Sequence, residues 1–539
     1  MAEPHTPFRI RQSVPARFAE PNAASPRDED LPQTPESGLS YKVGMAFSFL
    51  AMLAGGLMTV VFIMTRRAIA DPDIWWHLRN AEYLFKFGQL PRHDLYSFTV
   101  SGHPWMNHEW LAEIPYYLVW QAWGLTGIRT LVFVLVEGIF LGLLYLCYKE
   151  SGNFKAAVLA CCYSVFLATV SFGPRTILFG YAYLVVLLII LQRFRRAGRG
   201  PLWLIPPLFC LWANTHGSWL LGLIIFSIIA ATGFVDGKWG RVEAEPWSRP
   251  QRLKLAFTGL ASVAALFINP FTYHLVFYPF DLAFRQKLNI SHIAEWVSVD
   301  FHDTRGKLVL ILLVVLLLSA LLRDSRWTLG ELGLILFGLY SGLTYIRFLF
   351  LLGIVVAPLI AKVLDFMPPY QPEIDKRLLN GFLMLLMMGG MVYYWPSAAE
   401  LQDAVDRGYP TKALAYLKAH PPAAPMMNFY LWGGFLEWND RSVKVFVDSR
   451  VDIFEYAGVF QDYIDLLGLN EPKKILDKYG IRSVLFPPDE PLTYALEHDP
   501  GWRVLYRDSV SVLLERTDTG NATNEIRKSK PEGEHASRL

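Results

Sequence analysis

The sequence predicts an all-α polytopic membrane bundle of about eleven transmembrane helices, with a large first extracytoplasmic loop and a C-terminal extracytoplasmic α/β domain. Of the 539 residues, 53% are hydrophobic and only 18% are charged, whereas soluble domains carry about 25% charged residues. Apolar runs long enough to approach the span of a ~30 Å hydrocarbon core recur between residues 41 and 394. From about Thr411, short β-rich runs alternate with helical runs, which indicates a small α/β domain with a partly parallel sheet.

The apolar runs and the composition shifts divide the chain into four segments. We expect a disordered cytoplasmic tail at 1–40, a transmembrane domain at 41–396, a soluble domain at 397–516 and a disordered tail at 517–539. The expected spans lie near 41–65, 128–148, 155–172, 177–191, 202–215, 219–234, 255–268, 308–322, 329–345, 348–364 and 378–394. In the C-terminal segment the expected strands are 444–448, 483–486, 504–506 and 511–514, and the expected helices are 459–466, 472–479 and 492–498.

Charge and cysteine content exclude several function classes. Fifty Lys and Arg against 48 Asp and Glu give a net charge of +2, so no basic field favours a nucleic-acid partner. The four cysteines lie inside apolar runs, which predicts neither a disulfide framework nor a zinc site.

The basic residues of the short loops predict the orientation. Lys and Arg gather in the loops 193–199, 238–254 and 323–326, which follow every second span and therefore face the cytoplasm. The N-terminus is then cytoplasmic and the C-terminal domain extracytoplasmic, with Arg66 and Arg67 as a local exception. Eight of the 12 histidines fall in the outward loops: His77, His93, His103, His108, His216, His274, His292 and His302. This clustering predicts a polar site on the extracytoplasmic face.

Two carboxylates begin a helix in the first outward loop. Asp71-Pro72 is a typical helix start and predicts a helix over 73–87. Its apolar side is expected to lie at the membrane interface, with Trp75 at headgroup depth. Asp71 and Asp73 sit at the positive end of the helix dipole, where the ionised form is favoured. Such carboxylates can take a proton from a hydroxyl or hold a divalent cation; the alternative is that they only cap the helix.

Short strings in this loop resemble a family. The string Asp73-Ile74-Trp75-Trp76-His77-Leu78-Arg79 resembles Asp-Pro-Trp-Phe-Asn-Tyr-Arg of oligosaccharyltransferase catalytic subunits. His103-Pro104-Trp105 is similar to the His-Pro-Pro-Leu or Lys-Pro-Pro-Leu string of protein mannosyltransferases and aminoarabinose transferases. Together they resemble the integral-membrane glycosyltransferases of the GT-C fold. The Trp-Trp-Asp motif of oligosaccharyltransferases is absent, and Trp105 replaces the second proline, so the resemblance does not extend to protein N-glycosylation.

The resemblance implies a function and a set of roles. The donor is a polyprenyl-phosphate-linked sugar, the acceptor is a glycan, a lipid or a protein, and the location is the bacterial inner membrane. Asp73 activates the acceptor, Asp71 and Glu109 assist it, and Asp71 and Asp73 are the candidate ligands of Mg²⁺ or Mn²⁺. Arg79 helps to fix the loop and is a candidate for substrate binding.

A departing lipid phosphate needs positive charge or N–H donors at headgroup level. Further candidates for substrate binding therefore come from the outward ends of spans and the outward loops, where the alternative for an arginine is snorkelling to the interface. These candidates are His77, His108, Arg175, His216, His274 and Arg347. In the C-terminal domain, Gly433-Gly434 is expected to form a tight turn, and Val447–Arg450 is similar to segments that follow the membrane region of bacterial relatives.

Other functions stay open. A transporter or flippase for a lipid-linked or small polar substrate places ionisable residues at the membrane midplane, and Glu137 lies mid-span. A polysaccharide polymerase or ligase uses the same substrates without the first-loop carboxylates. A non-catalytic assembly protein fits the loop chemistry least well.

Overall fold

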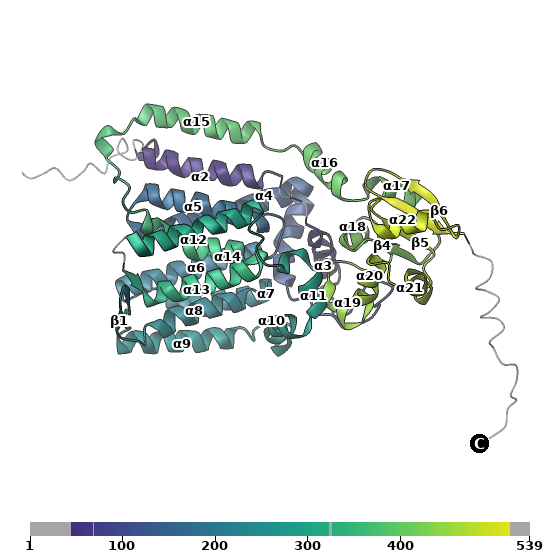
Figure 1. Ribbon diagram of the computed structural model, residues 1–539, viewed down its shortest axis with the longest axis horizontal. Coiled ribbons are helices and arrows are strands. Elements are labelled where there is room, and N and C mark those ends of the chain that lie inside the picture. The colour runs from purple at the N-terminus through teal and green to yellow at the C-terminus, as the bar shows by residue number, and fades with distance from the viewer. Residues whose placement is uncertain (1–44, 68, 70, 323–325, 518–539) are drawn as a thin grey trace, which may run out of the picture.

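The computed structural model describes residues 45–67, 69, 71–322 and 326–517. The expected tail 1–40 and residues 518–539 of the second tail lie outside the described residues. Figure 1 shows long helices running side by side in a bundle, with the C-terminal elements at one end. We call this the α3 end and the opposite end the β1 end, after the elements found there.

Within the described residues, each of the eleven expected spans contains a helix. The helices are α2 (Phe49–Thr65), α4 (Trp110–Ser151), α5 (Phe154–Ala168), α6 (Ile177–Ala197), α7 (Ile205–Thr215), α8 (Trp219–Thr232), α9 (Arg249–Ala265), α12 (Thr304–Leu322), α13 (Leu329–Thr344), α14 (Leu349–Val363) and α15 (Arg377–Tyr393). Helix α4 is broken at Gly124, whose φ of 56° is readily adopted by glycine. The break separates an α3-end segment from the span expected at 128–148.

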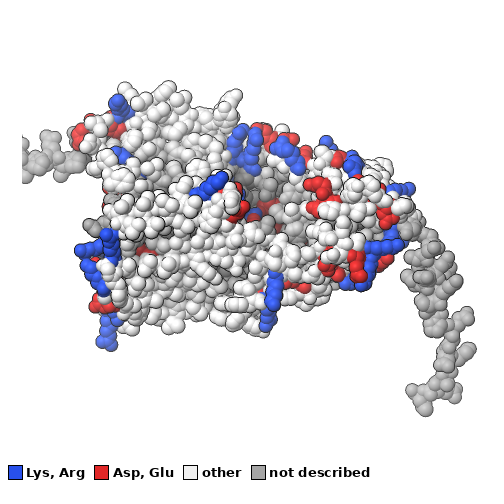
Figure 2. Space-filling model, in the orientation of Figure 1, with Lys and Arg blue, Asp and Glu red and all other residues white. Residues whose placement is uncertain are grey.

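Five helices of the described chain are long and apolar enough to cross a membrane, namely α4, α5 with η1 (Thr169–Ser171), α6, α12, and α14 with η4 (Ile346–Phe348). A sixth arises if α15 and α16 (Ala398–Gly408), which meet at 58°, form one bent span, and four shorter apolar helices accompany them. Charged side chains are sparse along the visible flank of the bundle (Figure 2). The chain is an integral membrane protein, while the count of eleven spans stays a prediction.

Helix α3 (Asp73–Phe87) has the expected bounds, and the Oδ1 atom of Asp71 accepts a hydrogen bond from the backbone N–H of Asp73 at 3.0 Å. The expected place of Trp75 at headgroup depth is wrong. Trp75 is only 3% exposed and contacts the ring of Phe435 at a centroid distance of 5.2 Å. The aromatic side of α3 therefore packs inside the protein, against α18 (Gly433–Asn439).

Short elements connect the spans at both ends of the bundle. The remaining helices of this region are η2 (Leu202–Leu204), α10 (Tyr273–Arg285), α11 (Lys287–His292), η3 (Ala294–Trp296) and η5 (Pro372–Ile374). The strands β1 (Lys238–Trp239), β2 (Val242–Glu243) and β3 (Trp327–Thr328) form a small sheet in which β2 pairs antiparallel with β1 and parallel with β3.

The C-terminal segment contains the expected mixed sheet. Its strands are β4 (Met426–Asn428), β5 (Ser483–Phe486), β6 (Trp502–Arg507) and β7 (Val512–Arg516), in the order β4-β5-β7-β6. The pair β4–β5 is parallel and the other two pairs are antiparallel, so the partly parallel sheet is confirmed. The other helices here are α17 (Thr411–Ala419), η6 (Tyr430–Trp432), α19 (Val451–Tyr456), α20 (Val459–Leu467), α21 (Pro472–Lys478) and α22 (Pro491–Glu497).

Two expectations for this segment are wrong. Residues 444–448 are not a strand of the sheet, because Val445 pairs with the first loop: its N–H donates to Tyr96 and its carbonyl accepts from Phe98. Gly433-Gly434 is not a tight turn but the start of α18. Trp76 and Trp105 of the first loop share an apolar core with residues of the C-terminal segment. The first loop and the C-terminal segment are thus packed as one unit, while the expected domain boundaries remain a prediction.

Candidate active site

A cavity of about 840 Å³ lies at the junction of the bundle, the first loop and the C-terminal segment. Figure 2 shows a hollow at this junction. Seven of the predicted site residues line the cavity, although they come from five separate parts of the chain: Asp71, Asp73, His77, Glu109, Arg175, His216 and Arg347. The structure therefore brings together most of the side chains that the sequence analysis selected.

Asp71 belongs to a buried charge cluster. Its Oδ2 atom lies 2.6 Å from the Nε of Arg175, and a terminal nitrogen of Arg175 pairs with Glu295. Burial raises the pKa of Asp71 to about 6, although the charge of Arg175 opposes the rise. Both oxygens of Asp71 are engaged, one by Arg175 and one by the backbone N–H of Asp73. Asp71 thus positions the start of α3.

Asp73 is a carboxylate of the cavity that keeps access to a ligand. It is partly exposed, and its Oδ1 atom accepts a hydrogen bond from the indole N–H of Trp76 at 3.2 Å. The same indole lies 3.1 Å from the hydroxyl of Ser449 in the C-terminal segment. Across the described residues, no Lys or Arg lies within 4.0 Å of the Asp73 carboxylate. Its position is set by a neutral donor rather than by an ion pair.

Glu109 is surrounded by imidazoles. Its carboxylate oxygens lie 3.3 Å from the Nε2 of His216 and 3.4 Å from the Nε2 of His77. The Nδ1 of His216 accepts the backbone N–H of Ser218 at 2.9 Å, so the proton of neutral His216 is on Nε2, facing Glu109. Burial and the charge of Arg347 lower the pKa of His216 well below its usual value. Burial raises the pKa of Glu109 to about 7, against the charge of His77.

His77 is held from behind by a fully buried carboxylate. Its Nδ1 lies 3.1 Å from Glu113, whose oxygens also accept hydrogen bonds from Asn80 at 3.1 Å and Asn107 at 2.7 Å. Burial lowers the pKa of His77, but the hydrogen bond to Glu113 and the charge of Glu109 outweigh burial, so the net pKa is raised. The chain Glu109–His77–Glu113 ties α3 to the start of α4.

Arg347 is the cavity-lining cation without a carboxylate partner. Its guanidinium carbon lies 4.2 Å from the ring centroid of Trp296, a cation–π contact. In the part of the chain that the structure describes, no Asp or Glu lies within 4.0 Å of its nitrogens. Arg175, in contrast, already pairs with two carboxylates. Arg347 is therefore the group best able to bind an incoming anion.

Three predicted substrate-binding residues lie outside the cavity lining. Arg79 pairs with Glu82 on the other side of α3. His274 lines a separate cavity of about 790 Å³. His108 is stacked on Tyr278 and its Nε2 lies 3.7 Å from Glu109, so it lies behind the cavity wall. The structure does not bring these three side chains to the cavity surface.

Other loops contribute a part of the cavity that the sequence did not predict. The turn after α11 supplies Glu295 and Trp296, and the C-terminal segment supplies Tyr430, Ser449 and Glu490. Ser449 belongs to the Val447–Arg450 string, which was the only sequence signal for this side of the cavity. The other contributions depend on docking between distant segments, which no local pattern reports.

The predicted metal ligands, Asp71 and Asp73, are not arranged as a metal-binding group. No group of three His, Cys, Asp or Glu side chains in the described chain is arranged to hold a metal ion. The oxygens of Asp71 already bind Arg175 and a backbone N–H.

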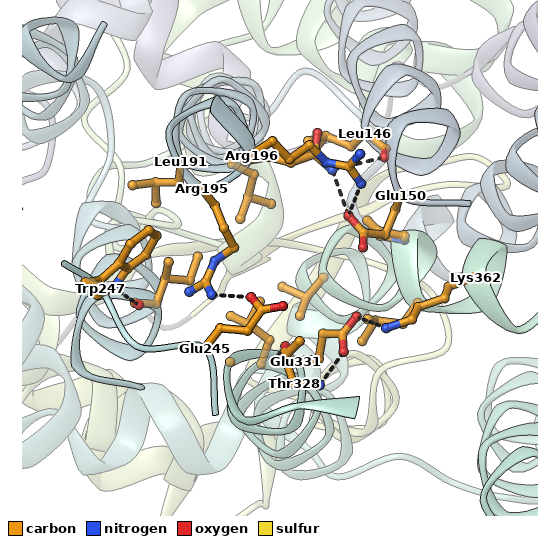
Figure 3. Close-up of a pocket in the computed structure, with 18 of the residues that line it drawn as sticks. Leu146, Glu150, Leu191, Arg195, Arg196, Glu245, Trp247, Thr328, Glu331 and Lys362 are labelled. Atoms are coloured by element: carbon orange, nitrogen blue, oxygen red, sulfur yellow. Dashed lines mark hydrogen bonds and ion pairs between the residues drawn. The ribbon is translucent and has the colours of Figure 1, made fainter. Parts of the chain in front are cut away.

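A second cavity, of about 560 Å³, lies at the β1 end of the bundle (Figure 3). Its charged side chains pair with one another in the figure, and its walls are leucine-rich. The pairs are Arg195–Glu245 at 2.6 Å, Arg196–Glu150 at 3.1 Å and Lys362–Glu331 at 2.7 Å. No residue of the predicted site lines this cavity, so the chemistry is assigned to the α3 end.

No family model and no curated protein matches the chain. Solved structures do match. The apo oligosaccharyltransferase of Archaeoglobus fulgidus is 10% identical over 84% of this chain and 70% of its own, with a TM-score of 0.44. ArnT from Cupriavidus metallidurans bound to undecaprenyl phosphate is 12% identical over 87% of this chain and 98% of its own, with a TM-score of 0.46. In the apo state the same protein covers 88% of this chain with a TM-score of 0.47.

Oligosaccharyltransferases are also one of the branches that the first-loop strings resemble.

Proposed function

We propose that this membrane protein is a glycosyltransferase that moves a sugar from a polyprenyl-phosphate-linked donor to an extracytoplasmic acceptor. The observation that carries the proposal is the pairing of roles in one cavity: Asp73 is a carboxylate free of ion pairs, and Arg347 is a cation free of carboxylates, within the described residues. Transfer from a lipid phosphate to a hydroxyl needs a base for the hydroxyl and a cation for the phosphate.

The proposed step is a displacement at the anomeric carbon. Asp73 takes the proton of the acceptor hydroxyl, and the hydroxyl oxygen forms the new bond to the anomeric carbon. The bond between that carbon and the phosphate oxygen breaks, and its electron pair stays on the lipid phosphate. Arg347 stabilises the negative charge that develops there. The acceptor, whether a glycan, a lipid or a protein, enters from the extracytoplasmic side.

The remaining cavity groups are proposed to position these two. Glu109, His216 and His77 lie close together and fix the wall beside Asp73. Asp71 and Arg175 hold the first turn of α3 and so set the direction of the Asp73 side chain. Mg²⁺ or Mn²⁺ beside Asp71 and Asp73 stays a prediction, and the assay below tests it directly.

The proposed orientation places the cavity outside the cytoplasm of a bacterium, at the inner membrane. The basic loops that follow α6 and α8 meet at the β1 end, where Arg195 and Glu245 form an ion pair. Short basic loops face the cytoplasm. The α3 end, with the cavity and the C-terminal segment, is then extracytoplasmic, and the N-terminus is cytoplasmic.

The test is an assay of purified full-length protein with a polyprenyl-phosphate-linked sugar, scored by release or transfer of the sugar. Asp73→Asn keeps the shape of the side chain but removes the base, and we expect a loss of about 10²–10⁴-fold in turnover. Asp281→Asn is the matched control, because Asp281 lines the neighbouring cavity of about 790 Å³ rather than the site. We expect the control to retain activity.

The same assay is run after EDTA treatment and again after addition of Mn²⁺ or Mg²⁺. Activity that is lost with EDTA and restored by the cation supports a metal at the site. Full turnover by a folded Asp73→Asn protein removes Asp73 from the mechanism.

A transporter or flippase is the second candidate, and one observation favours it. Glu137 of α4 is only 6% exposed, and neither carboxylate oxygen has a hydrogen-bond partner among the described residues. Buried ionisable groups in membrane helices often mark a transport path. Reconstituted protein that moves lipid-linked sugar across the bilayer without cleaving it supports this candidate and contradicts glycosyl transfer.

A further inference from the structure

Three arginines gather at the α3 end of the bundle, opposite to the basic loops. Arg66 and Arg67 directly follow α2, and Arg129 lies five residues beyond the break in α4. Glu400 is the carboxylate in contact with the first two, at 3.4 Å and 3.8 Å. Basic residues normally collect on the other side of a membrane. This group of three arginines, in contact with one carboxylate, therefore needs a separate explanation.

The three side chains differ in how they are bound. Arg66 donates to the backbone carbonyl of Tyr394 at 2.5 Å, whereas the Arg67 side chain is 61% exposed. Arg129 is fully buried, with its guanidinium carbon 3.9 Å from the ring centroid of Trp395 and 5.1 Å from that of Phe62. None of its three guanidinium nitrogens has a hydrogen-bond partner among the described residues. Much of the positive charge here is thus uncompensated.

An apolar groove of about 890 Å³ lies beside these arginines, between α2 and α15. The two helices run next to each other at the edge of the bundle (Figure 1). Arg66, Arg67 and Tyr394 line the groove at the α3 end, and Phe62 stands between the groove and Arg129. The rest of the groove is lined mainly by apolar side chains, including Ile63, Met64, Leu386, Met387 and Met391.

The groove is separate from the active-site cavity. The turn after α5 forms a wall between them: Thr169 and Phe172 line the groove, whereas Ser171 and Arg175 line the cavity. A phosphate bound at Arg67 is therefore on the other side of this wall from Asp73. An occupant of the groove does not take part in the displacement.

We propose that this groove binds an anionic phospholipid of the surrounding bilayer, with its phosphate on Arg66 and Arg67 and an acyl chain along α15. The charge of the arginines complements the phosphate, to which a guanidinium donates paired hydrogen bonds. Arg129 adds positive charge from behind the ring of Phe62. The apolar wall replaces lipid contacts that an acyl chain otherwise makes in the bilayer. The wall at Thr169–Phe172 favours a structural phospholipid over the reacting polyprenyl phosphate.

Two adjacent glycines of α15 provide a matched test. Gly390 lines the groove, and Gly389 is not part of its lining. A Cβ added at either position meets no atom within 4 Å, so the first carbon of a new side chain has room at both. Full-length protein is placed in bilayers of phosphatidylcholine with a minor fraction of phosphatidylglycerol, and retained lipid is counted by native mass spectrometry. We expect Gly390→Leu to lose the retained phosphatidylglycerol, while Gly389→Leu keeps it as the wild type does.

A charge variant tests the headgroup. Arg67→Gln is expected to weaken phosphatidylglycerol retention about fivefold, since one basic residue near a membrane surface contributes ~1 kcal/mol. Arg407→Gln, which removes an exposed charge from the C-terminal segment, is the control and is expected to leave retention unchanged. The melting temperature in lipid-free detergent shows that each variant is folded.

Equal retention by Gly390→Leu and Gly389→Leu overturns the proposal. So does equal retention of phosphatidylcholine and phosphatidylglycerol, because the arginines then play no part. Binding of undecaprenyl phosphate in place of phosphatidylglycerol, blocked by Gly390→Leu, also contradicts it and makes the groove a site for the carrier lipid instead.

Discussion

At the scale of single residues, the ion pairs and hydrogen bonds of each charged side chain show whether it is already bound by the protein or is free to meet a substrate. Asp71 and Asp73 are two residues apart, yet one is locked to Arg175 at 2.6 Å while the other accepts only a neutral indole N–H among the described residues. Arg175 and Arg347 differ in the same way, because the first pairs with two carboxylates. A side chain whose charge is already paired within the protein interacts more weakly with a charged substrate. Asp73 and Arg347 are therefore the residues to test first.

Arg347→Gln is expected to lower kcat/KM by about 10²–10³-fold, the usual cost of losing one donor to a developing negative charge. Steady-state kinetics with the lipid-linked sugar measures this. Arg92→Gln removes a charge from the wall of the neighbouring cavity and is expected to keep kcat/KM near that of the wild type. An Arg347→Gln enzyme with unchanged kcat/KM shows that the guanidinium only snorkels to the interface.

The pH dependence of the reaction is expected to follow the ionisation of the Glu109 carboxyl group. Its pKa is raised to about 7 by burial, so the carboxylate is ionised above that pH and protonated below it. Protonation removes the negative charge of the carboxylate, which lies 3.3 Å from the Nε2 of His216. We expect kcat/KM to fall as the pH drops through about 7, with Glu109→Gln, measured over the same pH range, losing this inflection. An inflection near 7 that survives in Glu109→Gln assigns it to another group.

Among the secondary-structure elements, α3 decides where the chemistry lies. The helix starts at Asp73 because Asp71 accepts its backbone N–H, and it is clamped on its aromatic side by α18. A Cβ on Gly434 of α18 would lie 3.2 Å from the backbone N of Trp76 and 3.3 Å from the carbonyl O of Pro72. These neighbours are backbone atoms near the start of α3, which cannot rotate away. Glycine at 434 therefore permits the close contact that places Trp76 against Asp73.

Gly434→Val is expected to push α18 away from α3, because a branched side chain extends past that tight Cβ. Overpacking of this kind costs about 1–3 kcal/mol. We expect a lower melting temperature, measured by thermal unfolding in detergent, together with a loss of turnover as the Trp76–Asp73 hydrogen bond is disturbed. Gly408→Val is the control, since a Cβ there meets no atom within 4 Å. Equal melting temperatures for the two variants contradict the close-packing argument.

At the scale of the whole molecule, the distribution of charge predicts which way the bundle faces. The β1 end contains the basic loops, and the α3 end contains the cavity and the C-terminal segment. The intervening flank is largely uncharged on the face seen in Figure 2. This arrangement predicts that the α3 end, with the cavity, faces away from the cytoplasm.

A topology reporter tests the orientation. A reporter that is active only outside the cytoplasm is expected to be active when fused after Pro396 and inactive when fused after Gly200, in the basic loop that follows α6. Cytoplasmic activity at Pro396 overturns the expected orientation and moves the cavity to the other compartment.

The sequence by itself determined the features that depend on neighbouring residues. The bounds of α3 follow from Asp71-Pro72 and the following helix pattern, and the helical nature of all eleven expected spans follows from their apolar runs. The acidic pair, the basic loops and the alternation of strands and helices in the C-terminal segment were also predictable. Each of these signals acts over a few residues, within the reach of a capping hydrogen bond or one turn of helix.

Only the tertiary structure decided which distant groups meet. Arg175 and Asp71 are 104 residues apart, and Ser449 and Trp76 are 373 apart. Residues 444–448 read as a strand of the sheet, but their partner is the first loop. Arg79 and His274 carry suitable charge or ring nitrogens, yet the direction of their elements takes them away from the cavity. Packing between separate segments sets these distances, and side-chain type alone contains no information about that packing.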